Sequence, residues 1–137
     1  MTTRGVRGAT TVDRNDAAEI AERSVELVRV LVELNGIRPE ELASAVFTVT
    51  DDLNAEFPAK PVRSLPGWED VPLLCAKEIA VPGSLPRCIR VLLHWNTDTA
   101  HSGVRHAFLR GARRLRPAWA VRVPGDEDGG APGEDLR

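Results

Sequence analysis

Two charged residues stand inside apolar runs of the chain, where a charge is costly unless it is paired or used. Glu78 lies within VPLLCAKEIAV (71–81) and Arg90 within CIRVLLHW (88–95), and both runs are typical of β-strands. A structural ion pair between neighbouring strands would explain both residues. A site for an anionic ligand would explain them equally well, so the sequence leaves both interpretations open.

The basic residues are nearly all arginines and are concentrated late in the chain. Sixteen of the eighteen basic residues are arginine, and residues 85–123 carry a formal net charge of +7 although the whole chain carries −2. A guanidinium group suits carboxylates and phosphates, which it can bind with two parallel hydrogen bonds. A solvated surface and an anion-binding site are both compatible with this cluster, which contains Arg105, Arg110, Arg113, Arg114 and Arg116.

Several other classes of protein fit the sequence poorly. Only six aromatic residues, no tyrosine, no nucleic-acid-binding motif and a negative net charge argue against a nucleic-acid partner. The three histidines (His94, His101, His106) lack metal-ligand spacing, so no metal site is expected. No apolar run approaches the ~18 residues of a membrane span. Without an export signal, Cys75 and Cys88 are expected to be free thiols in the cytoplasm.

The chain is long enough for one domain, predicted over residues 1–123 and followed by an acidic, Gly/Pro-rich tail (124–137) that is expected to be disordered. Hydrophobic periodicity and turn residues predict a mixed sheet with helices packed on it, an α/β (α+β) fold. The predicted elements are a strand at 4–12, a helix from Asn15 or Asp16 to Gly36, a strand at 44–50, a proline-rich loop with one or two helical turns at 51–72, strands within 71–81 and 88–95, a helix from Ser102 to about Arg110, an extended segment at 112–117 and a short strand at 119–123.

Strand alternation restricts which of these side chains can meet. In the first strand it sets Arg7 on the face opposite Val6 and Gly8. Cys88 and Arg90 share parity and can face one cavity. Cys75 and Glu78 have opposite parity, so one cavity can receive both only if a bulge or a strand end lies between them.

Five short motifs, in this order and spacing, resemble the monofunctional AroH-class chorismate mutases from about Arg4 to Pro117. They are RGVRGATTV near the start, FPAKPVR at 57–63, CAKE at 75–78, CIRV at 88–91 and the RHAF…LRP run at 105–117. The resemblance implies a homotrimeric pseudo-α/β-barrel with clefts at the subunit interfaces. It also implies the Claisen rearrangement of chorismate to prephenate, on the route to phenylalanine and tyrosine, with neither cofactor nor metal.

The same resemblance assigns roles to individual residues. Arg90 would be the cation beside the breaking ether bond, and Arg7 would bind the side-chain carboxylate. Glu78, with Cys75 beside it, would orient the ring hydroxyl. The other implied roles are apolar packing from the adjoining subunit by Phe57, attraction or covering of the dianion by Lys60, Arg63 and Arg116, lining of the entrance by Leu115, and a neighbouring position for Cys88.

One departure from the family pattern affects substrate binding. Phe108 stands where the family commonly has tyrosine, so the ring packing is kept and a hydroxyl that would bond a substrate carboxylate is lost. We therefore expect weaker binding without loss of the reaction. The alternative to an enzyme is a non-catalytic trimer that binds a small carboxylate metabolite in the same clefts.

Overall fold

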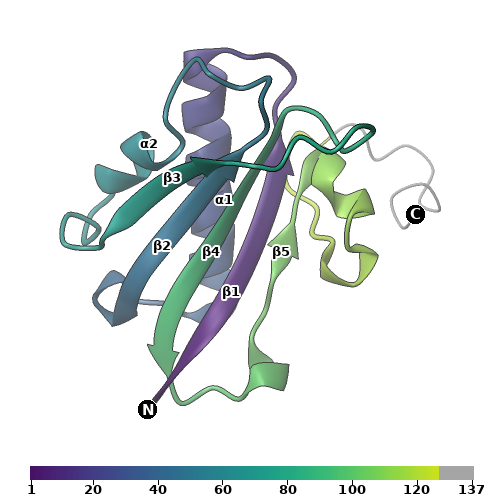
Figure 1. Cartoon of the computed structure of the whole chain (residues 1–137). Helices are drawn as coiled ribbons and strands as arrows, with labels where there is room; N and C mark the ends of the chain where they lie inside the picture. Colours follow the sequence, from purple (N-terminus) through teal and green to yellow (C-terminus); the bar gives the residue numbers. More distant parts are fainter. Residues whose placement is uncertain (127–137) are drawn as a thin grey trace.

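The computed structural model describes residues 1–126, which form one mixed sheet with helices on a single face (Figure 1). The strand order is β3-β2-β4-β1-β5, with β4 antiparallel to β1 and β2, and with the pairs β2–β3 and β1–β5 parallel. The strands are β1 (Thr2–Thr11), β2 (Leu42–Val49), β3 (Leu73–Lys77), β4 (Cys88–Thr97) and β5 (Ala107–Phe108), and the helices are α1 (Ala17–Asn35) and α2 (Ala59–Arg63). The predicted α+β class with a mixed sheet is confirmed.

Helix α1 begins and ends where the sequence predicts. The Asp16 carboxylate accepts a hydrogen bond from the Glu19 backbone N–H at 2.9 Å and so caps the first turn. Gly36 ends the helix with φ of 68°, a left-handed conformation that glycine adopts at little cost. Ile20, Leu27 and other apolar side chains at helical spacing are buried against the sheet.

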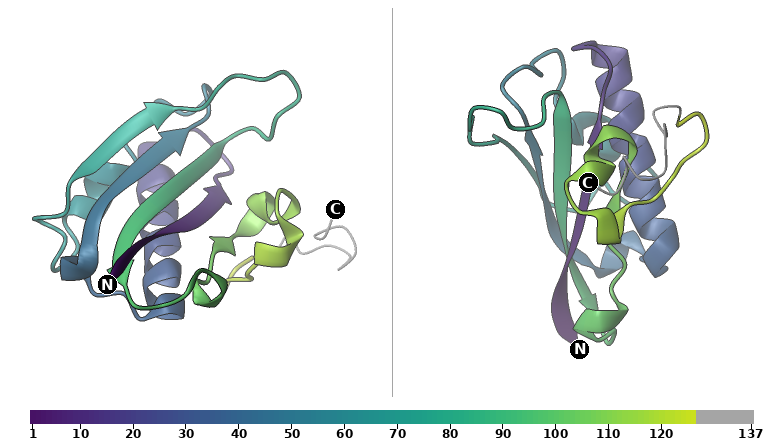
Figure 2. Two further views of the ribbon diagram at one scale, coloured as in Figure 1. Left: turned by 60° about the horizontal axis from the view of Figure 1, so that its bottom comes forward. Right: turned by 90° about the vertical axis from the view of Figure 1, so that its right-hand side faces the viewer.

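Gly8 lets α1 approach β1 closely. A Cβ at Gly8 would lie 2.8 Å from the Cδ1 of Leu31, closer than carbon atoms normally pack. Val6 is fully buried on the same face of β1, whereas Arg7 is half-buried on the opposite face, as alternation predicts. Figure 2 shows the sheet from two further directions, with α1 on one face and the C-terminal segment at the β1–β5 edge.

The chain after β4 differs from the prediction. No helix runs from Ser102 to Arg110; two short 3₁₀ helices (His101–Gly103 and Arg110–Arg114) flank strand β5 instead. Tertiary contacts explain the difference, because β5 pairs in parallel with β1 and the Leu109 N–H donates to the Ala9 carbonyl at 2.8 Å. The extended segment and final strand expected over 112–123 are also wrong: a further 3₁₀ helix (Pro117–Trp119) is followed by a single bridge.

The described part of the chain ends in a packed turn. The side chains of Arg113 and Asp126 are both buried and form an ion pair at 3.2 Å. The rest of the predicted tail, 127–137, lies outside the described residues. Within residues 1–126, no helix is long and apolar enough to span a membrane.

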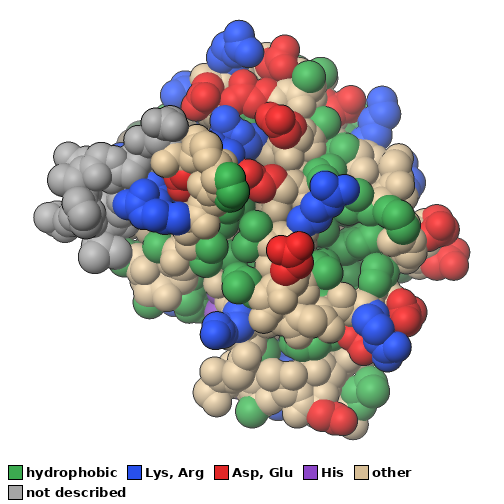
Figure 3. Space-filling model, turned by 180° about the vertical axis from the view of Figure 1, so that it is seen from behind, with side chains coloured by type: hydrophobic (Ala, Val, Ile, Leu, Met, Phe, Trp, Pro, Cys, Tyr) green, Lys and Arg blue, Asp and Glu red, His purple; other side chains and the backbone are tan. Residues whose placement is uncertain are grey.

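The face covered by α1 shows no concentration of one charge sign. Seen from behind, acidic and basic side chains are scattered together among hydrophobic ones (Figure 3). Arg110, one of the arginines that the sequence singles out, belongs to this mixed surface, since its side chain pairs with Glu26 of α1 at 3.0 Å.

Candidate active site

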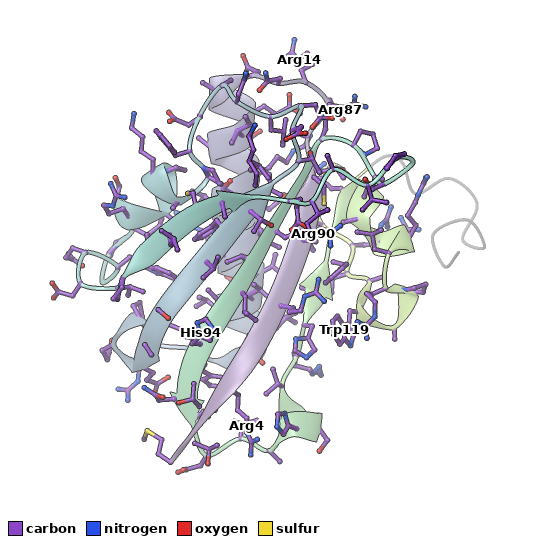
Figure 4. All side chains as sticks on the ribbon, in the orientation of Figure 1. Arg4, Arg14, Arg87, Arg90, His94 and Trp119 are labelled. Atoms are coloured by element: carbon purple, nitrogen blue, oxygen red, sulfur yellow. The ribbon has the colours of Figure 1, made fainter. Side chains whose placement is uncertain are left out.

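Arg90 and Glu78 meet on the face of the sheet turned away from α1. Arg90 lies in β4 opposite Thr48 of β2, and Glu78 directly follows the last residue of β3 (Figure 4). The Arg90 Nε lies 3.7 Å from Glu78 Oε2, and the Thr48 hydroxyl donates a hydrogen bond to that same carboxylate oxygen. The two residues that the sequence finds out of place in apolar strands are thus close neighbours.

The Arg90–Glu78 pair leaves Arg90 able to bind something else. The 3.7 Å separation exceeds hydrogen-bond distance, and the buried Nε of Arg90 has no hydrogen-bond partner within residues 1–126. A buried donor without an acceptor is costly, and such a donor in a native structure calls for an explanation. The Nε itself is closed to solvent, but the Arg90 side chain as a whole is 27% exposed, so a ligand can approach its outer part.

Two further guanidinium groups lie close enough to act on the same region. The Arg7 guanidinium carbon lies 5.5 Å from the centre of the Phe108 ring. Burial lowers the pKa of Arg7, and the nearby positive charges of Arg90 and Arg116 lower it further, yet an arginine side chain remains protonated. Three guanidinium groups against the one carboxylate of Glu78 leave a formal surplus of two positive charges, which suits a dianion.

The start of β4 is held firmly, and this determines where Arg90 lies. Arg87 adopts a left-handed conformation with φ of 50°, and its N–H donates to the two Asp52 carboxylate oxygens at 2.9 and 3.1 Å. In the next residue, the Cys88 N–H donates to the Thr50 hydroxyl at 3.0 Å. Arg90 therefore projects from a strand whose first residues are fixed on both sides.

Cys88 and Phe108 form an apolar floor beside the arginines. Both are fully buried in a small cluster against which Leu115 packs in part. Burial raises the pKa of the Cys88 thiol, while the neighbouring Arg90 guanidinium opposes that shift. Cys88 thus lies close to Arg90, and its thiol stays protonated near neutral pH.

Arg116 belongs to a stack of side chains at the β5 edge. Its guanidinium carbon lies 3.7 Å from the centre of the Trp119 ring, and that ring lies 4.0 Å from His106. His106 Nδ1 accepts a hydrogen bond from the Arg7 backbone N–H at 3.0 Å. Burial lowers the pKa of His106, and the positive charges of Arg7 and Arg116 add to this effect, so the ring is neutral near pH 7.

Sequence reasoning assigned no role to Thr48, His106 or Trp119. Thr48 shares a face with Arg90 only because of the β2–β4 register, which no local pattern specifies. His106 stands within the RHAF motif, so its place beside an expected site residue was a usable signal.

The remaining predicted residues form a second group on the other side of the sheet, around α2 and the β3 edge. Phe57 is 67% exposed there, and the Lys60 ammonium lies 3.5 Å from the Glu56 carboxylate. An open hollow of about 480 Å³ is lined by Phe57, Ala59, Lys60, Arg63, Leu73, Leu74 and Cys75.

Within the chain, the structure does not bring Cys75 beside Glu78. Cys75 pairs with Phe47, whose side chain is buried in the core on the α1 side, while Glu78 contacts Thr48 on the opposite face. Strand β3 ends at Lys77, so the strand end required by their opposite parity lies between them. The two groups of predicted residues are therefore separated by the thickness of the sheet.

The described residues offer no group of three or more His, Cys, Asp or Glu side chains that could hold a metal ion. Both cysteines are free. The first group of site residues, around Arg90, therefore offers three guanidinium groups (Arg7, Arg90 and Arg116), the carboxylate of Glu78 and the apolar side chains of Cys88 and Phe108.

Comparisons with known proteins agree on one family. Residues 3–119 match the family model described as chorismate mutase type I. Two similar proteins are both named chorismate mutase AroH. That of Thermus thermophilus is 53% identical over 115 residues, covering 83% of this chain and 93% of the relative. That of Bacillus subtilis is 42% identical over 117 residues, covering 85% and 92%. A solved chorismate mutase from Clostridium thermocellum superposes with a TM-score of 0.78 at 44% identity, covering 80% of this chain and 97% of that one.

Proposed function

The chain belongs to the chorismate mutase type I family and is a chorismate mutase, an isomerase of aromatic amino-acid biosynthesis. We propose that it accelerates the rearrangement electrostatically, through the arginines on the open face, which is the face of the sheet turned away from α1. The reaction is unimolecular: the ether C–O bond of chorismate breaks while a C–C bond forms, and no proton is transferred. Negative charge grows on the enolpyruvyl oxygen and positive charge on the ring. A cation fixed beside that oxygen binds the transition state more tightly than the ground state, which is the condition for raising kcat.

Arg90 is the residue proposed for that cation. The observation that carries the proposal is its buried Nε, which has no acceptor within residues 1–126 and lies beyond hydrogen-bond distance of Glu78. The Arg90 side chain is 27% exposed although its Nε is closed to solvent, so the outer part of the guanidinium is the part that would donate to an ether oxygen as it gains charge. The donor is already held by the β4 ladder, so no reorganisation is needed as the charge develops.

Arg7 and Glu78 would hold the substrate in its reactive, chair-like form. We propose that Arg7, with Arg116, binds substrate carboxylates, which accords with the surplus of two positive charges around Glu78. Glu78 would accept a hydrogen bond from the ring hydroxyl. Because the Thr48 hydroxyl already holds one of its carboxylate oxygens, the other remains available for that bond. Holding a flexible substrate in this way lowers the entropic part of the barrier.

We further propose a homotrimer in which the second group of residues completes the site of an adjoining subunit. One chain cannot surround a ligand with both groups, since they lie on opposite faces of its sheet. The open face also exposes apolar side chains without a covering helix in residues 1–126: Leu74 is 64% exposed, and Val46 and Leu92 are half-buried. Burial of such a face against other copies would let Phe57, Lys60, Arg63 and Cys75 reach the arginines.

We also propose a cytoplasmic location. Two free cysteines in a chain of this size are typical of a reducing compartment.

The role of Arg90 is tested by replacement with glutamine, which keeps much of the shape and removes the charge. We expect kcat for prephenate formation, measured without added metal or cofactor, to fall at least ~10²-fold, on the scale of losses for one oxyanion-stabilising group. The matched control is Arg114→Ala, an exposed arginine outside the open-face group, which should leave kcat unchanged. A kcat near that of the wild type in a folded Arg90→Gln protein would contradict the proposal.

A further inference from the structure

Trp119 lies between two groups that the proposed site uses. One side of its indole ring meets the Arg116 guanidinium, whose central carbon is 3.7 Å from the ring centre. The His106 ring is stacked at 4.0 Å with a tilt of 39°, and the Phe108 ring meets Trp119 edge-on at 5.6 Å. Three partners therefore define where the indole lies.

Hydrogen bonds attach the stack of Arg116, Trp119 and His106 to the β-sheet. His106 receives the Arg7 backbone N–H at its Nδ1, so the imidazole is tied to the strand that carries a proposed carboxylate-binding arginine. Past Trp119, Val121 N–H donates to the Phe108 carbonyl at 2.9 Å and holds the following backbone against β5. Trp119 is thus fixed from its ring and from its backbone.

Within residues 1–126, the stack on Trp119 is the main contact that holds the Arg116 side chain in place. Arg116 is exposed and stands just before the 3₁₀ helix Pro117–Trp119, and an unrestrained arginine side chain samples many rotamers. Stacking on an indole supplies cation–π attraction and leaves the in-plane N–H groups of the guanidinium free to donate to a carboxylate. Ordering the side chain before the ligand arrives removes part of the entropic cost of binding.

We propose that Trp119 is a positioning residue that holds the Arg116 guanidinium ready for a substrate carboxylate, and that His106 orients the indole. The proposal rests on the proposed function only in that Arg116 binds substrate. Trp119 acts through Arg116 and does not touch the reacting atoms. Since Arg116 would bind ground state and transition state alike, its loss affects KM more than kcat.

The test is a double-mutant cycle on the full-length enzyme with Arg116→Ala and Trp119→Leu. We expect Trp119→Leu to raise KM for chorismate about two- to fivefold with little change in kcat, the range given by cation–π energies at exposed sites. In the double variant, KM should rise no further than in Arg116→Ala alone, because the indole acts only through the guanidinium. Trp119→Phe keeps a flat ring face and should restore most of the wild-type KM.

Three results would overturn the inference: an unchanged KM in a folded Trp119→Leu enzyme, multiplicative effects of the two substitutions, or no rescue by phenylalanine. Thermal unfolding of each variant separates these from a loss of fold. The KM values of the Trp119 variants do not depend on the role proposed for Arg90. If that role is wrong, the error will show in the kcat of Arg90→Gln instead.

Discussion

At the scale of single residues, the site depends on where charges stand rather than on how many there are. Arg90 and Glu78 interrupt apolar strands, and the structure brings them to 3.7 Å without letting them satisfy each other. A fully satisfied buried pair would serve stability or specificity alone. At 3.7 Å, Arg90 and Glu78 still orient each other, but the guanidinium can donate to a ligand and the carboxylate can accept from one.

Phe108 permits a test at the same scale. Phe108→Tyr would add a hydroxyl to a ring that already contacts the Arg7 guanidinium. We expect KM for chorismate to fall by about two- to tenfold with kcat nearly constant, because one neutral hydrogen bond contributes about 0.5–1.5 kcal/mol. Steady-state kinetics at fixed ionic strength would measure this, and an unchanged KM would mean that the hydroxyl finds no partner on the substrate.

At the scale of elements, the segment after β4 is positioned by long-range contacts. Strand β5 has only two residues, and its place beside β1 depends on bonds such as those of Asn35, which accepts the Arg105 N–H and donates to the Arg105 carbonyl, both at 2.8 Å. His106 adds its contact with the Arg7 backbone. Local propensity favours a helix from Ser102, and these contacts outweigh it.

The His106 contact predicts a pH dependence. The pKa of His106 is lowered in the folded protein, so folding favours the neutral ring, which alone can accept the Arg7 N–H. This contribution to stability is fully present above about pH 6.5, the ordinary histidine value, and is lost as the pH falls through the folded-state pKa. Thermal unfolding midpoints between pH 7.5 and 5 should therefore fall, and KM should rise in parallel.

The matched variant is His106→Asn, whose side-chain oxygen can replace Nδ1 as acceptor but does not titrate. Its unfolding midpoint should depend less steeply on pH than that of the wild type at equal protein concentration. The same slope in both proteins would assign the pH dependence to groups other than His106.

At the scale of the whole molecule, the proposed trimer predicts that each site takes residues from two subunits. Subunit complementation tests this sharply. Arg90→Gln damages the first group, and Arg63→Ala damages the second. If sites are shared between subunits, unfolding and refolding a mixture of the two variants should restore about a quarter of the sites in randomly mixed trimers.

Mixing without unfolding is the control, and it should restore little activity if subunits exchange slowly. If every chain builds its own complete site, refolded mixtures will be no more active than the separate variants. Sedimentation of the refolded sample shows whether trimers have formed.

The amino-acid sequence by itself determined the limits of α1, the mixed sheet and the residue types at the site. Helix caps, apolar periodicity and strand parity are local properties, so Asp16, Gly36 and the outward direction of Arg7 could be predicted. The motifs indicated the family, since their order and spacing are linear features. Strand alternation also predicted that Cys75 and Glu78 could reach one cavity only with a bulge or a strand end between them.

Only the tertiary structure decided which of those residues meet. The β2–β4 register brings Thr48 to Glu78 and Arg90, and the parallel pairing of β5 with β1 brings His106 and Trp119 to Arg7 and Arg116. It also separates Cys75 from Glu78 within one chain. These are contacts between residues far apart in sequence, whose energies come from packing and hydrogen bonds across strands, and no local pattern encodes them.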